Sequence, residues 1–140
     1  VGQSVDSMRL FDVVQAARAI VRDSQVDGTR VMICGRGVSG ALGLYAAILL
    51  PEIHQVTLIN PPASHREGPI FLNILRYADL PEAAALLSPR RLNFLARMPE
   101  AYSQTREIFA LYGRKDHVFL SMSLEGLLAG RCHHGLVSGW

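Results

Sequence analysis

Residues 31–47 read VMICGRGVSGALGLYAA, and their glycine spacing is one that two different chemistries use. A short apolar run leads into Gly35, Gly37 and Gly40, and a second apolar run follows. In the first chemistry, written G-x-S-x-G, a strand, a sharp turn and a helix expose a nucleophilic serine at the tip of the turn. In the second, written G-x-G-x-x-G, glycines let the backbone approach a pyrophosphate. The chain fits the second pattern literally, whereas Gly37 occupies the position of the nucleophile in the first.

Other residues near this turn could also take part in chemistry. Ser39 is the one serine in the turn and could act as a displaced nucleophile, although a small residue in the first turn of a helix is the simpler interpretation. His65 and Arg66 follow the next apolar run, at the edge of an α/β sheet that faces the ligand crevice. We therefore take His65 and Arg66 as candidates for binding in the cleft.

Hydrophobic periodicity predicts the elements that must position these residues. Continuous or alternating apolar runs predict strands over residues 31–34, 55–60, 91–96 and 117–124. Longer periodic segments predict helices over residues 5–23, 38–50 and 99–112, and two short helices are expected over 70–78 and 82–87. This alternation predicts an α/β fold with a mostly parallel sheet of about four strands and helices on both faces.

Two features of the predicted sheet concern its packing. The small residues Gly40, Ala41 and Gly43 should let the helix over 38–50 lie close to the sheet. Cys34, inside an apolar strand, is expected to be a small core residue.

Three segments in sequence resemble one known family. They are MRLFDVV at 8–14, the glycine turn with its small-residue helix, and LRYADLPEA at 75–83 followed by SPRRL at 88–92. Together they resemble the C-terminal half of an α/β-hydrolase, closest to the acetyl-xylan-esterase and prolyl-oligopeptidase-like branch. The resemblance implies a partial α/β-hydrolase fold over residues 1–125, and residues 126–140 have no clear period and are expected to form an irregular tail.

The resemblance also implies a catalytic triad, and this sequence departs from it at each position. Gly35, Gly37 and Val38 would form the elbow and the oxyanion region, but glycine has no side chain with which to attack an ester. The acid should follow the strand over 91–96, where no carboxylate occurs before Glu100. The histidine should follow the last strand, where none occurs before His133. We therefore expect impaired or absent catalysis.

A shifted alignment to the same family gives a second hypothesis. If residues 107–113 formed the strand before the acid, Asp116 would be the acid and His133 or His134 the base. The second hypothesis is therefore an active serine esterase that uses either Ser39 or this shifted triad. This alignment leaves little chain between Asp116 and His133 for the helix and strand that the fold normally has there.

The glycine spacing leaves a third hypothesis, an NAD(P)-type nucleotide-binding domain. Such a fold needs an acidic residue about 20 positions after the glycines to hold the ribose hydroxyls. Asn60 occupies that place, and Arg66 nearby could instead pair with a phosphorylated ribose.

Composition limits the partners. Apolar residues make up 49% of the 140-residue chain and charged residues 19%, with a net charge of +2, which predicts a folded domain and neither a nucleic-acid partner nor a membrane partner. The two cysteines suggest no disulfide framework, and Cys132 with His133 and His134 makes no convincing metal site, so we expect no cofactor and no metal. The chain opens with Val, which suggests a fragment or a processed product, and it indicates no compartment. The expected partners are a missing N-terminal half of the domain and a small-molecule ester or carbohydrate.

Overall fold

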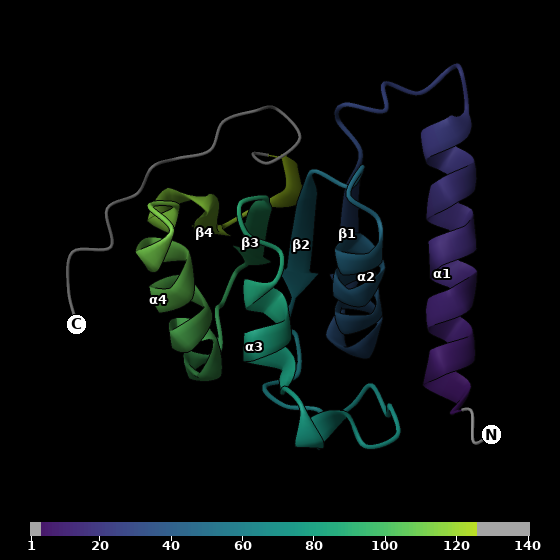
Figure 1. Ribbon diagram of the computed structural model, residues 1–140. Coiled ribbons are helices and arrows are strands. Elements are labelled where there is room, and N and C mark those ends of the chain that lie inside the picture. Colours follow the sequence, from purple (N-terminus) through teal and green to yellow (C-terminus); the bar gives the residue numbers. More distant parts are fainter. Residues whose placement is uncertain (1–3, 126–140) are drawn as a thin grey trace.

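A single parallel sheet is the centre of the fold (Figure 1). The computed structural model describes residues 4–125. The sheet contains β1 (Met32–Arg36), β2 (Gln55–Ile59), β3 (Arg91–Leu95) and β4 (Val118–Ser121), paired in the order β1-β2-β3-β4. Each neighbouring pair is parallel, with Met32 opposite Gln55, Gln55 opposite Arg91, and Leu92 opposite Val118. The predicted α/β class and parallel sheet are confirmed.

Four helices flank this sheet. They are α1 (Val5–Arg22), α2 (Gly37–Leu49), α3 (Leu80–Ala85) and α4 (Ser103–Leu111). Three short 3₁₀ turns complete the described elements: η1 (Ile74–Arg76), η2 (Glu100–Tyr102) and η3 (Lys115–His117). Ser4 caps α1 by accepting a hydrogen bond from the backbone N–H of Ser7 at 3.1 Å.

The helices between residues 4 and 125 cover one face of the sheet, not both (Figure 1). The physical reason is the strand order. Each of α2, α3 and α4 joins a strand to its immediate neighbour in the same direction, and right-handed crossovers in one direction place their helices on one face. Helices on both faces would require the strand order to reverse. α1 lies beside α2 on this same side.

The core lies between this face and the helices. The inward strand residues Val56, Leu58, Leu92 and Phe94 are fully buried. Phe94 packs edge-on against Tyr102, with ring centroids 5.0 Å apart. Arg90 closes the C-terminal end of α2, since its Nη1 donates to the carbonyl oxygens of Ala47, Leu50 and Ile53 at 2.6, 2.9 and 2.9 Å. Burial lowers the pKa of Arg90, and Glu52 opposes that shift.

Three sequence-based predictions need correction. Cys34 is exposed, because alternation along β1 turns it to the sheet face away from α2, while its neighbour Ile33 packs towards Gly43. Residues 70–78 form only the turn η1, because Asn73 has a left-handed φ of 62° that interrupts a helix. β4 ends at Ser121, before the predicted limit at residue 124.

The small residues of α2 behave as predicted. A Cβ added to Gly43 would lie 2.5 Å from Cγ2 of Ile33 on β1. The helix therefore approaches the sheet more closely than any larger residue at this position would allow. Among residues 4–125, no helix combines the length and apolar character needed to cross a membrane. The predicted tail over 126–140 lies outside the described residues.

Candidate functional site

The turn between β1 and α2 is a sharp strand-to-helix turn with Gly37 at its tip. Gly37 is the first residue of α2 and has a φ of +55°, in the left-handed region that side chains rarely adopt. A Cβ built on Gly37 would have no atom within 4 Å. Any side chain at this position would therefore extend into open space from a strained backbone, which is how an elbow presents its nucleophile.

Gly35 and Gly40 set the sharpness of this turn. A Cβ on Gly35 would lie 2.6 Å from Cα of Gly40, and a Cβ on Gly40 would lie 2.6 Å from the carbonyl oxygen of Gly35. Real Cβ atoms essentially never approach so closely. The end of β1 and the start of α2 can touch only because both residues are glycines.

The two remaining residues of the turn differ in their surroundings. Ser39 is exposed in the first turn of α2, and its hydroxyl makes no hydrogen bond within residues 4–125. Val38 is half-buried and faces the loop after β2, where a Cβ on Gly68 would lie 3.1 Å from Cγ2 of Val38. The turn is therefore in contact with that loop.

The places expected to hold a triad acid and base hold neither over the described residues. Because the strands are parallel, the segments that follow β1, β3 and β4 meet at one edge of the sheet, the carboxyl edge. β3 is followed by Ala96, with a φ of 68°, and then by Arg97, before Glu100 begins η2 with an exposed side chain. β4 is followed by residues 122–125, which contain no histidine.

The structure contradicts the strand that the shifted alignment to the hydrolase family requires. It required a strand over residues 107–113, and α4 occupies most of that range. Asp116 lies in η3, immediately before β4, whereas Gly37 and Ser39 lie after β1. In a parallel sheet these positions are at opposite edges, separated by a strand length of roughly 13 Å for four residues. Asp116 and Ser39 are therefore not brought together, and His133 lies outside the described residues.

His65 has a structural position in the loop after β2. Its side chain is 5% exposed, and its Nδ1 is 2.7 Å from the carbonyl oxygen of Pro69. A carbonyl can only accept, so Nδ1 carries the proton, and Nε2 then accepts from the hydroxyl of Tyr45 at 2.8 Å. Burial, together with the nearby charges of Asp79 and Glu82, raises the pKa of Tyr45 to about 12, so the hydroxyl remains a donor. Both ring nitrogens of His65 are thus engaged within the protein.

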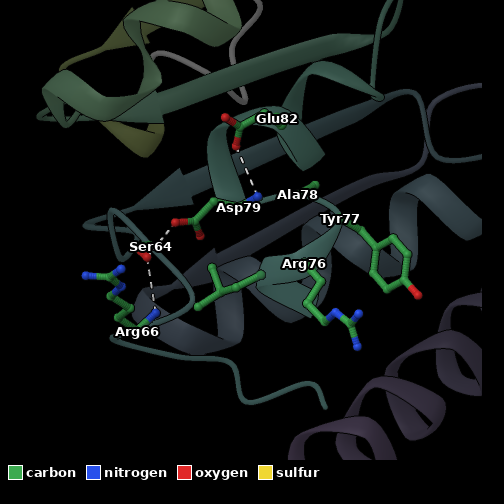
Figure 2. Close-up of a pocket in the computed structure, with 8 residues that line it drawn as sticks. Ser64, Arg66, Arg76, Tyr77, Ala78, Asp79 and Glu82 are labelled. Atoms are coloured by element: carbon green, nitrogen blue, oxygen red, sulfur yellow. Dashed lines mark hydrogen bonds between the residues drawn. The ribbon is translucent and has the colours of Figure 1, made fainter. Parts of the chain in front are cut away.

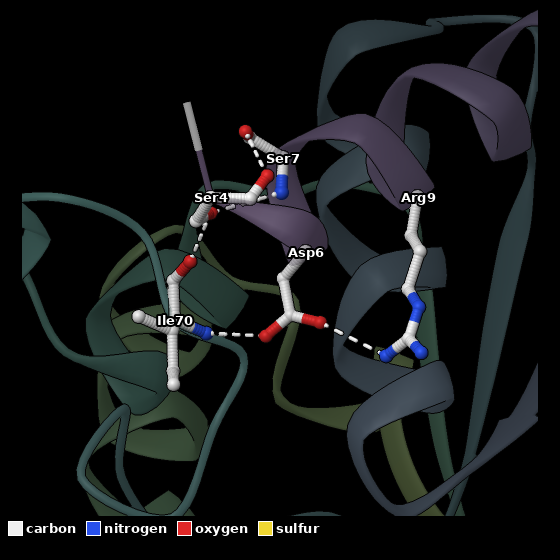
Figure 3. A network of polar contacts seen from close by, with 5 residues as sticks. All are labelled: Ser4, Asp6, Ser7, Arg9 and Ile70. Carbon is white, nitrogen blue, oxygen red and sulfur yellow. Dashed lines mark hydrogen bonds and ion pairs between the residues drawn. The ribbon is translucent and has the colours of Figure 1, made fainter. Parts of the chain in front are cut away.

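The same loop is fastened to α1 at its far end (Figure 3). The backbone N–H of Ile70 donates to Asp6 at 2.7 Å, and the hydroxyl of Ser4 donates to the carbonyl oxygen of Ile70. Asp6 also pairs with Arg9 at 3.3 Å. Two side chains from the first turn of α1 thus hold the backbone of a residue 64 to 66 positions away.

A pocket opens beside this loop (Figure 2). We call it the loop pocket; it has a volume of about 600 Å³ and its lining includes Arg66, Leu75, Arg76, Tyr77, Asp79 and Glu82. Its walls come from the loop after β2 and from the start of α3, which runs from the carboxyl edge of the sheet. Arg66, predicted as a cleft residue, therefore lines a pocket at the same edge as the glycine turn.

Asp79 organises one side of the loop pocket. It accepts hydrogen bonds from Ser64 Oγ at 2.5 Å, from the backbone N–H of His65 at 2.6 Å and from that of Leu80 at 2.8 Å. Glu82 in turn accepts from the backbone N–H of Asp79 at 3.1 Å, which completes a capping box for α3. Burial alone would raise the pKa of Asp79, but these hydrogen bonds outweigh it and hold the pKa below its usual value.

Sequence reasoning missed most of the lining of the loop pocket. Arg76, Tyr77, Asp79 and Glu82 were visible only as part of a family-like segment, with no role attached. One signal was available: Asp79 and Glu82, three residues apart with Pro81 between them, match the pattern of a capped helix start. That pattern predicts the start of α3 but not a pocket.

The strand order also bears on the nucleotide hypothesis. The dinucleotide-binding order 3-2-1-4-5-6 places the fourth strand beside the first, at the point where the ligand binds. Here β4 pairs with β3 instead. Asn60, at the position of the ribose-binding acid, is exposed with a φ of 45°. No group of three or more potential metal ligands occurs among residues 4–125.

Comparison with known proteins adds no further assignment. No protein-family model matches the chain, and no curated protein matches it.

Proposed function

We propose that this chain is an α/β-hydrolase-like domain portion whose glycine turn has lost the ability to attack esters, and that it binds a small molecule at the carboxyl edge of its sheet. The observation that carries the proposal is the geometry of Gly37. It has the left-handed backbone and open surroundings of a nucleophile position, and it has no side chain. Glycine adopts this backbone readily, so the turn can keep its shape with no side chain at its tip.

The order of the strands supports the same comparison with the second half of an α/β-hydrolase. Three consecutive strand–helix–strand units run in one direction from the turn, as the resemblance to the second half of an α/β-hydrolase implies. In that comparison the acid would follow β3 and the histidine would follow β4. Within residues 4–125, neither of these two positions holds the required residue. We infer that the loss extends beyond the nucleophile to the whole triad.

The binding role rests on the loop pocket. Its volume of about 600 Å³ falls within the range typical of small-molecule sites, roughly 300–1,000 Å³. It lies at the edge where α/β sheets bind their ligands. The loop that forms it is fixed at three points, by Tyr45 on α2, by Asp6 on α1 and by Tyr102, whose hydroxyl donates to the carbonyl oxygen of Pro62 at 2.9 Å.

Hydrolysis of 4-nitrophenyl acetate tests the loss of catalysis. We compare the wild-type chain, Gly37→Ser and Ser39→Ala, and we expect all three to hydrolyse the ester at the same background rate. Wild-type turnover that Ser39→Ala abolishes would overturn the proposal in favour of an active esterase. A gain of turnover in Gly37→Ser alone would show that an acid and a base are in place, which would overturn the loss of the whole triad.

A further inference from the structure

The loop pocket presents two positive groups that the protein itself does not use. Arg66 and Arg76 both line it, and neither takes part in an ion pair within residues 4–125. In Figure 2 the two side chains lie on opposite sides of the pocket, and their guanidinium groups point away from each other. A guanidinium with no internal partner, at the rim of a pocket, is suited to a carboxylate because it can donate two parallel hydrogen bonds.

The two acidic residues of the loop pocket accept different numbers of hydrogen bonds from the protein itself. Asp79 accepts three hydrogen bonds from the protein, which leaves it one of about four acceptor positions. Glu82 accepts one, through Oε2, and its Oε1 accepts none among the described residues. Neither carboxylate pairs with an arginine. Glu82 Oε1 is therefore an acceptor available to a hydroxyl group of a ligand.

The remaining lining is apolar and exposed. Tyr77 is 84% exposed and Leu75 is 50% exposed. They offer a surface for the carbon skeleton of a small molecule. The pocket therefore combines cationic donors, a carboxylate acceptor and an apolar side.

We propose that the loop pocket binds a small hydroxylated carboxylate, with Arg66 or Arg76 donating to its carboxylate and Glu82 accepting from a hydroxyl. This names the ligand class for the binding role proposed above and rests on it. A neutral polyol would leave the guanidinium groups without an anionic partner. A bare inorganic anion would leave Glu82 Oε1 and the apolar side without contacts.

Titration of the wild-type chain with glucuronate, glucose and inorganic phosphate, followed by calorimetry, tests this assignment. Glucuronate and glucose share a ring and differ at one carboxylate, so their difference reports the anionic contact. We expect glucuronate to bind at least about tenfold more tightly than glucose, since a charge-assisted pair is worth about twice a neutral hydrogen bond. We expect phosphate to bind more weakly than glucuronate.

The variants Arg66→Ala and Arg76→Ala locate the site. At least one should weaken glucuronate binding by about tenfold, whereas Arg106→Ala, which removes an exposed arginine of α4 outside the pocket, should leave it unchanged. Equal binding of glucuronate and glucose, phosphate binding as tight as glucuronate, or wild-type affinity in both pocket variants would overturn the proposal. These readouts are independent of ester hydrolysis, so failure here can be told apart from failure of the proposed loss of catalysis.

Discussion

Gly40 meets Gly35 so closely that a Cβ on Gly40 would lie 2.6 Å from the carbonyl oxygen of Gly35. The carbonyl oxygen that such a Cβ would meet belongs to the backbone, so it cannot move aside without shifting β1 or α2. The glycine spacing that first suggested two chemistries is therefore, at these two positions, a requirement of packing.

Gly40→Ala should consequently destabilise the fold. We expect the free energy of unfolding to fall by about 1–3 kcal/mol, the usual cost of forcing an extra group into a packed site. Urea denaturation of the wild type and the variant measures the change. Gly28→Ala is the matched control, because a Cβ there would meet only ordinary contact at 3.6 Å, and it should be neutral or slightly stabilising. Equal stability of Gly40→Ala and the wild type would contradict the close approach.

Much of the fold follows from local sequence pattern. The apolar runs at β1, β2 and β3 predict strands, and the periodicity of α1 and α2 predicts helices, because the apolar residues recur at the spacing of each element. The local pattern does not predict which face of the sheet each helix covers, since this depends on the order of the strands. Cys34 shows the consequence: the sequence predicts the strand that contains it, but not that its side chain lies on the exposed face of that strand.

The site was less predictable, because distant contacts shape it. Ile70 would continue a helical pattern by local propensity, yet Ser4 and Asp6 hold its backbone from more than 60 residues away. His65 was predicted to face the cleft from its place after β2, and the loop instead folds it against Tyr45 and Phe71. No pattern within a local window records these contacts.

The hydrogen bond between Tyr45 and His65 should stabilise the loop. Tyr45→Phe removes the hydroxyl and leaves a buried ring nitrogen without its donor, so we expect a loss of about 1–3 kcal/mol in the free energy of unfolding. Tyr112→Phe, at a tyrosine that is 72% exposed, serves as the control and should change stability little. A cost in Tyr45→Phe no larger than in Tyr112→Phe would argue against this role of His65.

The lowered pKa of Asp79 predicts an acid-sensitive loop. A carboxyl group whose folded pKa lies below its unfolded value stabilises the fold above the unfolded pKa and loses that contribution as pH falls through the folded one. The usual value is 3.8, so the contribution should be complete at neutral pH and fade below about pH 3.8. Thermal melts of the wild type and Asp79→Asn should differ at neutral pH and converge in acid. A difference that stays constant with pH would refute the assignment, and Asp12→Asn, at an exposed residue of α1, provides the control.

β1 forms one edge of the sheet within residues 4–125, with β2 as its one partner strand there. An unpaired strand edge is a template for association. We expect the 140-residue chain to self-associate with rising concentration in sedimentation velocity experiments. Cys34→Lys places a charge on the edge strand and should reduce association, whereas Met122→Lys, after β4, should not. A monomer at all concentrations with one cooperative melt would contradict this.

The central claim is that the turn at Gly37 retains the shape of a nucleophile elbow without a reactive group. Intact-mass spectrometry of the folded wild-type chain after treatment with a fluorophosphonate probe tests it most directly, because such probes modify only activated serines. We predict that treatment adds no mass to the wild-type chain, and that it likewise adds none to Ser39→Ala. A single adduct on Ser39, absent from Ser39→Ala and lost when the chain is unfolded before labelling, would contradict the account.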